Sequence, residues 1–336
     1  MKAGSAARTL ACLLAVALMG LCSCRRDLYR ETRPSMSTLL TVIVAGGPPP
    51  DWDALFTLAD TEAARFDYRR KESPLWRLNR EGSARLDAGL AALLKSALKI
   101  AEDSGGAFDP TLLPVTALWS FETGGRVPAP EELALARSRT GYRALRLDSA
   151  GKASLPEGFA LDLGGIAKGA VVDLLAEHLI ESGRGDFLIE AGGDIMISGL
   201  KGSGRPWVIA IRHPRKSDAV LGLLRLGGEE QQTAVVTSGD YERYFEREGV
   251  RYHHILDPAT GAPARGLISV TVIAPTAAEA DGLATAAFVL GGEAGLRLLE
   301  ERSRVEGLLI EEDGGMLRAR ATGGFPLSPA DLELND

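Results

Sequence analysis

The segment that most constrains the fold is residues 160–169, ALDLGGIAKG, which joins a short apolar run to a helical pattern. Apolar residues then recur at helical spacing, so the segment predicts a strand, a glycine turn and a helix. Glycines let a ligand approach the backbone, and the free amides at a helix start favour negative charge. The segment is a candidate cradle for a phosphorylated ligand, although an ordinary tight connection would have the same pattern. It matches neither the GxGxxG nor the P-loop spacing, so a bound nucleotide would lie in a different fold.

The first 23 residues are typical of a lipoprotein signal peptide. Lys2 and Arg8 precede an apolar run over residues 10–21 that is too short to cross a bilayer. Residues 21–24, LCSC, resemble a bacterial lipobox, which makes Cys24 the expected lipidated first residue; Cys22 follows a bulky leucine and fits less well. Residues 24–35 would then form a tether. The alternative is a cleaved soluble protein with an incidental cysteine.

This N-terminus indicates the compartment. A lipid anchor implies a cell-envelope protein that faces the periplasm, with the inner membrane as the expected location. All three cysteines lie within residues 12–24, so the mature chain has no internal disulfide framework. The net charge of −7 would fall to −9 with the loss of Lys2 and Arg8, which argues against nucleic-acid binding.

Helices and strands alternate irregularly along the rest of the chain. Its 336 residues, 45% of them apolar, can bury a large core. The irregular order predicts an α+β fold with one large mixed domain over residues 36–326 and a tail at 327–336. We expect helices at 51–66, 87–100, 131–139, 166–180, 277–290 and 295–302. We expect strands at 36–45, 145–147, 153–155, 186–190, 194–198, 207–211, 220–226, 233–237, 269–274, 307–311 and 316–320.

Two oxygen-bearing side chains share one face of the helix expected at 277–290. Asp281 and Thr285 are four residues apart, among small and apolar neighbours. A carboxylate and a hydroxyl suit a hard cation such as Mg²⁺, which takes few protein ligands. Alternatively, Asp281 pairs with a nearby amide or arginine and Thr285 bonds to its own helix.

A pair of histidines precedes an Asp-Pro turn. His253 and His254 are expected on an extended segment, where only one of them would face a given pocket. A histidine there could act as a general base for a hydroxyl nucleophile, or both could be structural. No histidine or cysteine cluster completes a zinc site. We interpret His178 and His213 as structural or exposed.

Taken together, these motifs resemble the ApbE family, the FAD:protein FMN transferases. Eight blocks occur in the family order, and they cover nearly all of residues 36–291. The blocks are Met36–Thr38, Ser73–Asn79, Gly106–Thr111, Leu161–Gly169, Gly192–Asp194, Thr237–Ser238 with Arg243, Tyr252–Gly261 and Ala280–Thr285. Residues 190–191 depart from the family, which commonly has asparagine before the glycine pair.

The resemblance implies a magnesium-dependent enzyme that splits FAD and attaches FMN through a phosphoester to a threonine of an acceptor flavoprotein, releasing AMP. His254 would be the catalytic base, and the backbone carbonyl of Gly165 with Asp281 and Thr285 would hold Mg²⁺. Tyr68 stands one residue out of register with the family tyrosine. The residues implied to contact FAD are Met36, Tyr68, Ala107, Phe108, Asp109, Asp162, Gly165 and Lys168. The competing functions are an FAD-binding envelope lipoprotein and an FAD pyrophosphatase that yields FMN and AMP.

Overall fold

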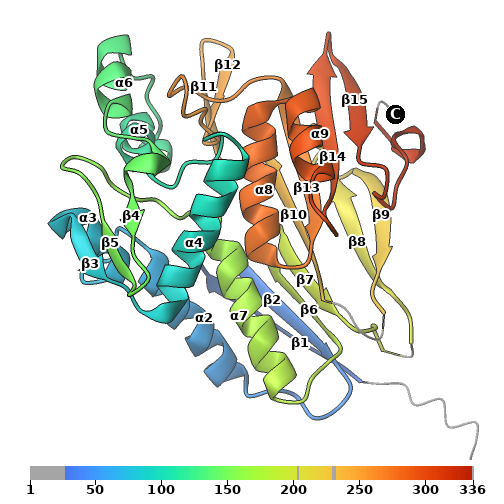
Figure 1. The fold of residues 1–336 in the computed structure, drawn as a ribbon. Helices are drawn as coiled ribbons and strands as arrows, with labels where there is room; N and C mark the ends of the chain where they lie inside the picture. Colours follow the sequence, from blue (N-terminus) through green and yellow to red (C-terminus); the bar gives the residue numbers. More distant parts are fainter. Residues whose placement is uncertain (1–26, 203, 229–231, 335–336) are drawn as a thin grey trace, which may run out of the picture.

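The fold is built on one eight-stranded antiparallel sheet. The computed structural model describes residues 27–334 except 203 and 229–231, so the signal peptide and Cys24 lie outside the described residues. The sheet has the strand order β1-β2-β6-β7-β10-β13-β14-β15 (Figure 1). Its strands are β1 Leu28–Ser35, β2 Thr38–Ala45, β6 Phe187–Ala191, β7 Asp194–Ser198, β10 Thr233–Gly239, β13 Leu267–Ala274, β14 Glu306–Asp313 and β15 Met316–Ala321.

Helices cover one face of this sheet. In Figure 1 α7 and α8 stand in front of the strands, and α8 packs on β10 and β13 as well as on α7. The main core fills this interface, and every residue of β13 is buried. The helices are α2 Trp52–Phe66, α3 Pro74–Glu81, α4 Ala88–Asp103, α5 Leu113–Trp119, α6 Pro130–Arg137, α7 Ala167–Glu181, α8 Ala277–Leu290 and α9 Gly292–Glu300. Within the described ranges no helix is long and apolar enough to cross a membrane.

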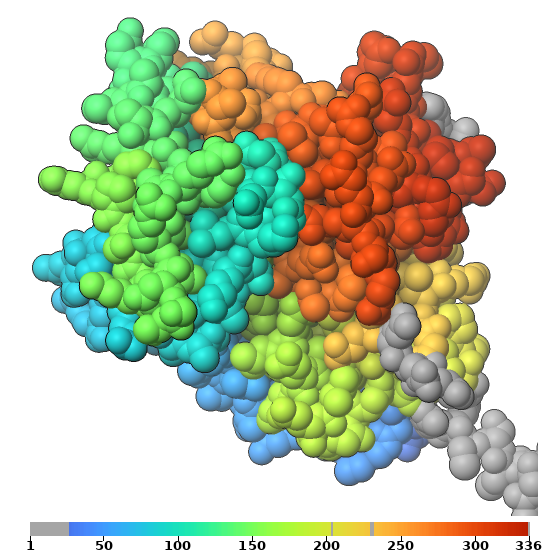
Figure 2. Space-filling view, in the orientation of Figure 1, coloured from blue at the N-terminus to red at the C-terminus, as the bar shows by residue number. Residues whose placement is uncertain are grey.

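Smaller sheets complete the molecule. The hairpin of β8 (Trp207–Arg212) and β9 (Val220–Leu226) covers the other face of the large sheet over a second apolar core. A three-stranded sheet contains β3 (Ser83–Arg85), β4 (Arg146–Leu147) and β5 (Lys152–Ser154). The hairpin of β11 (Tyr244–Arg247) and β12 (Val250–His253) packs against α5 and α6 through a third core. In Figure 2 the α5–α6 segment (green) and the β11–β12 hairpin (light orange) adjoin at the top of the view.

The predicted α+β class is confirmed, but the two ends of the domain need correction. The tether expected over residues 24–35 is wrong for Leu28–Ser35, which forms edge strand β1 in register with β2. The sequence does not reveal β1 because the strand is rich in charged residues, which edge strands tolerate. The Arg33 guanidinium lies over the Phe56 ring and pairs with Asp53 at 2.8 Å. The expected tail is likewise packed: Leu332 is buried against the second core, and the Glu333 amide donates to the Leu221 carbonyl.

The strand expected before the glycine turn is also wrong. Around Ala160 there is only an isolated bridge to Leu112. Asn79 takes the place of a neighbouring strand, because its side-chain amide donates to the Leu161 carbonyl at 2.9 Å and its oxygen accepts from the Leu161 amide at 2.7 Å. The Ser73–Asn79 block therefore holds the backbone that leads into the glycine turn.

The last glycine of the turn segment sets the distance between two helices. A Cβ on Gly169 of α7 would overlap the backbone of Ala277 and Ala278 at the start of α8. Asp173, one turn later on α7, accepts from the Ala277 and Ala278 amides and so caps α8. Close packing at Gly169 thus places α8 and its residue Asp281.

Replacing Gly169 with valine should lower the free energy of unfolding by about 2 kcal/mol or more, because backbone atoms rather than a flexible side chain must move. Thermal or urea unfolding of the purified protein measures the change. Gly185→Ala is the matched control, since a Cβ added at Gly185 would meet nothing within 4 Å. Equal stability of the two variants would contradict the packing argument.

Candidate active site

Three elements bring a lysine and two aspartates together at the start of α7. Lys168, in the first turn of α7, places its Nζ 2.7 Å from Asp194 Oδ2 of β7 and 3.6 Å from Asp281 Oδ2 of α8. Asp194 is 1% exposed and Asp281 is 4% exposed. The large sheet therefore supplies one carboxylate, and the helical layer supplies the lysine and the second carboxylate.

The cluster carries more negative than positive charge when both carboxylates are ionised. Burial raises the pKa of Asp194, Asp281 raises it further, and Lys168 opposes both effects. Although burial alone would lower the pKa of Lys168, the two carboxylates raise it above its usual range, so the lysine stays protonated. Such a surplus of buried negative charge favours a further cation.

A hard cation fits the predicted ligands. Asp281 Oδ2 is buried and has no hydrogen-bond partner among the described residues. A Cβ on Gly165 would lie 3.5 Å from Thr285 Oγ1, so the Gly165 backbone, Thr285 and Asp281 adjoin one another. Across the described residues, no three His, Cys, Asp or Glu side chains form a metal-binding group. A cation here would depend on one carboxylate, one hydroxyl and one carbonyl, a set that suits Mg²⁺ completed by phosphate and water.

Asp194 ends the Gly192–Asp194 block, and the sequence motifs indicate no role for it. The sequence feature that could have identified it is the position of an acidic residue at the start of the largely apolar strand Asp194–Ser198. Only the fold shows that this carboxylate meets Lys168. Asp194 is therefore the partner that holds the lysine in place.

The loop after α4 brings two further predicted residues to Gly165. Phe108 is 5% exposed, and a Cβ on Gly165 would lie 3.2 Å from its ring. Its neighbour Ala107 is half-buried. Asp109, predicted to contact FAD, uses its carboxylate within the loop: it accepts from the Thr111 amide and hydroxyl and from the Tyr142 amide. The Asp109 carboxylate therefore holds the conformation of this loop.

Asp162 lies close enough to Tyr68 to influence the pKa of that tyrosine. Burial raises the pKa of Tyr68 to about 12, and the charge of Asp162 adds to the shift. Burial also raises the pKa of Asp162, whereas Arg243 and Arg69 lower it. The Asp162 carboxylate accepts from the Gly164 amide at 2.8 Å, which shapes the glycine turn.

Met36 lies at the tip of the β1–β2 hairpin. Met36 and Ser37 both have positive φ angles, 52° and 62°, which is costly for residues other than glycine. The adjacent Thr38 packs against Gly192 in the β6–β7 turn, next to Asp194. The hairpin tip therefore adjoins the end of the sheet that carries the acidic cluster.

The two histidines point in different directions, as their extended segment predicts. His253 is buried: its Nε2 lies 3.0 Å from the Ala264 carbonyl, and its ring meets Phe288 edge-on. His254 has its Nδ1 3.1 Å from the Arg243 carbonyl, which also accepts from the His254 amide. Because a carbonyl only accepts, Nδ1 carries the proton and Nε2 is the basic nitrogen.

Burial lowers the pKa of His254 to about 3, and the positive charge of Arg243 contributes to the shift. The ring is therefore neutral at neutral pH. The positive charge of Arg243 also lowers the pKa of Asp162 and opposes the rise in the pKa of Lys168, so this exposed arginine is within electrostatic reach of His254, the lysine cluster and the glycine turn. In the sequence, Arg243 stands out only as part of a matching block.

Acid should destabilise the wild-type fold through His254. In the unfolded chain His254 takes up a proton below its ordinary pKa of 6.5, whereas the folded ring does so only near pH 3. The free energy of unfolding should therefore fall as the pH falls from 6.5 towards 3. We expect the melting temperature to drop a few degrees more between pH 7 and 5 in the wild type than in His254→Asn. Calorimetry at both pH values tests this, since other groups titrate alike in both proteins. Equal losses would contradict it.

Comparisons with known proteins agree with this geometry. The ApbE family model matches residues 36–309. A Treponema pallidum protein named FAD:protein FMN transferase is 39% identical over 294 residues, covering 81% of this chain and 79% of the relative. A Haemophilus influenzae protein of the same name is 36% identical over 277 residues, covering 77% and 78%.

Solved structures share the fold. The Thermotoga maritima ApbE protein has a TM-score of 0.78 and 34% identity, with 87% of this chain and 96% of that chain covered. The Vibrio cholerae flavin transferase ApbE has a TM-score of 0.78 and 31% identity, with 89% and 98% covered. These matches place the chain among enzymes of the flavin transferase type. More particularly, the chain belongs to the ApbE family, which confirms the resemblance seen in its motifs.

Proposed function

We propose that this protein cleaves FAD and transfers FMN to a threonine hydroxyl of an acceptor protein, with Mg²⁺ bound and AMP released. The observation that carries the proposal is the acidic cluster, in which Asp281 Oδ2, without a hydrogen-bond partner among the described residues, lies beside Lys168 and close to Gly165 and Thr285. The names of the relatives support the same activity.

Each residue has a role set by its position. Lys168 and Arg243 would balance the charge of the FAD pyrophosphate, and Phe108 and Met36 would provide apolar contacts. Gly165, Asp281 and Thr285 would hold Mg²⁺, which stabilises the negative charge that develops on the phosphate oxygens. His254 Nε2 would accept the proton of the threonine hydroxyl. The new threonine–phosphorus bond forms while the phosphorus–oxygen bond to AMP breaks.

A mass measurement tests this function. The protein without residues 1–23 is incubated with FAD, Mg²⁺ and a candidate redox-complex subunit that carries the target threonine. We expect the subunit to gain the mass of FMN, with one AMP released for each FMN attached. A subunit with its target threonine changed to alanine is the control. FMN and AMP formed at the same rate without any acceptor would favour the pyrophosphatase instead.

We also propose a lipid anchor at Cys24 that holds the enzyme on the periplasmic face of the cell envelope, with the inner membrane as the expected location. The LCSC sequence at 21–24 supports it.

Replacing Cys24 with alanine should release the protein from the membrane fraction or leave its signal peptide uncleaved, because no thiol remains for the acyl chain. Cell fractionation with mass analysis of the N-terminus measures the outcome, and Cys22→Ala is the matched control. Normal processing and membrane retention of Cys24→Ala would contradict the anchor.

A further inference from the structure

We propose that Asp240 and Arg215 are positioning residues that hold the Arg243 carbonyl where it fixes the ring of His254. The inference rests on the proposed function, since His254 is the base of that reaction. Neither FAD nor Mg²⁺ needs to contact Asp240 or Arg215.

The hairpin β11–β12 links the two halves of the Arg243–His254 contact. Arg243 directly precedes β11, and His254 directly follows β12. The Arg243 carbonyl accepts from the His254 amide at 3.0 Å and lies 3.1 Å from its Nδ1. Any movement of one strand end relative to the other would therefore change the orientation of the imidazole ring.

An aromatic cluster holds the hairpin on one side. Phe245 of β11 stacks on Tyr252 of β12 with ring centroids 5.2 Å apart, and both meet Trp119 at the end of α5. The Trp119 indole donates to the Gly261 carbonyl at 2.8 Å, beyond the histidine pair. These contacts tie the hairpin to the α5–α6 lobe.

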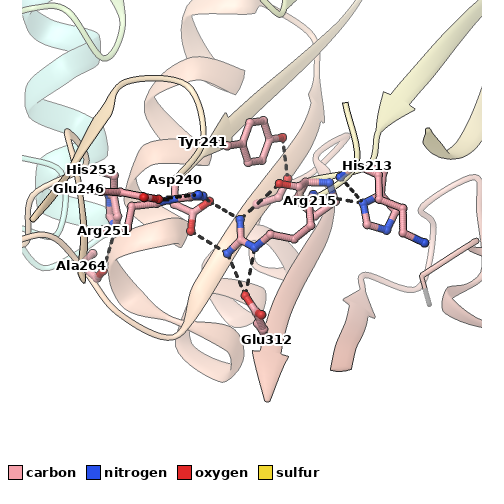
Figure 3. A network of polar contacts seen from close by, with 12 residues as sticks. His213, Arg215, Asp240, Tyr241, Glu246, Arg251, His253, Ala264 and Glu312 are labelled. Atoms are coloured by element: carbon pink, nitrogen blue, oxygen red, sulfur yellow. Dashed lines mark hydrogen bonds and ion pairs between the residues drawn. The ribbon is translucent and has the colours of Figure 1, made fainter. Parts of the chain in front are cut away.

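An ion network holds the hairpin to the large sheet (Figure 3). Arg215 makes a bidentate pair with Asp240, at 2.7 and 2.8 Å, and bonds Glu312 of β14 at 2.9 Å. Arg251 of β12 lies 3.7 Å from Asp240 and bonds Glu246 of β11 at 3.2 Å. Asp240 is 7% exposed, and its amide donates to the Ile268 carbonyl.

The network therefore reaches both ends of the hairpin. Asp240 lies three residues before Arg243, and Arg251 lies three residues before His254. A bidentate arginine–carboxylate pair fixes orientation as well as distance. Without it, the Arg243 carbonyl is free to shift, and the His254 Nδ1–H loses the acceptor that selects its tautomer.

The decisive variant is Asp240→Asn. It keeps the size of the side chain and leaves Arg215 paired with Glu312, so no arginine is left uncompensated in the fold. We expect kcat for FMN transfer to fall about tenfold, because small misplacement of a catalytic group is costly, while the Kd for FAD changes less than about twofold. Glu293→Gln, which breaks the exposed pair with Arg297 on α9, is the control and should leave both unchanged.

A double-mutant cycle separates positioning from general destabilisation. If Asp240 acts through His254, adding Asp240→Asn to His254→Asn should cost no further rate. A second tenfold loss in that background would overturn the inference. The milder Arg251→Gln should act in the same direction as Asp240→Asn.

NMR of the imidazole nitrogens gives a readout that does not depend on turnover. The wild-type ring of His254 should be the Nδ1–H tautomer, and Asp240→Asn should show a mixture. An unchanged tautomer together with an unchanged rate would overturn the inference. If the wild type transfers no FMN, the proposed function fails, and the tautomer measurement alone decides the positioning role.

Discussion

Replacing His254 with asparagine should lower the rate of FMN transfer by about a hundredfold or more, while FAD still binds. The threonine hydroxyl must lose a proton as it attacks phosphorus, whereas AMP leaves as a stable anion, so a base is needed more than an acid. His254 presents a neutral ring whose Nε2 is the basic nitrogen, because Nδ1 donates to the Arg243 carbonyl. An asparagine amide can keep that donation but cannot accept the proton. Single-turnover kinetics with FAD and acceptor protein measure the loss.

The other histidines provide controls. His178 is exposed on α7, so His178→Asn should transfer FMN at the wild-type rate. His253 packs against Phe288, so its replacement should mainly lower stability. A His254→Asn enzyme with near-normal transfer across neutral pH would exclude His254 as the base, and Asp257 would be the next residue to test.

Replacing Asp281 with alanine should lower magnesium-dependent turnover by about a hundredfold to a thousandfold. Asp281 provides the one carboxylate of the proposed cation site, and its Oδ2, 3.6 Å from Lys168 Nζ, has no hydrogen-bond partner within the described structure. The variant should still fold, because Lys168 keeps its 2.7 Å pair with Asp194. FAD affinity should fall much less, since the flavin would be held by Met36 and Phe108. Transfer rates over a magnesium titration, with FAD binding measured separately, test the prediction.

A control on the same helix makes the test specific. Glu279 is two residues earlier and therefore faces away from Asp281, so Glu279→Gln should keep the wild-type magnesium dependence. If Asp281→Ala kept the wild-type rate at limiting magnesium, the Asp281–Thr285 pair would be structural and the cation would have to bind elsewhere.

Local patterns in the chain were enough to predict most helices and strands, and the order of the motifs indicated the family. Periodicity and capping residues carry this information over short distances. Asp51 and Asp87 cap α2 and α4 at the start of the helices expected there, because an N-cap depends only on residues within one turn. The spacing of Asp281 and Thr285 likewise puts both on one face of α8, whatever surrounds the helix.

Which groups meet in space could be learned only from the folded chain. β1 exists because β2 offers a partner, although its own residues, LYRETRPS, have little apolar pattern. Asp194 is 26 positions from Lys168 in sequence, and only the β6–β7 hairpin and α7 packing bring them together. The tautomer of His254 depends on a carbonyl eleven residues away. Charge balance, proton position and close backbone packing arise from contacts between distant segments, so local sequence patterns do not encode them.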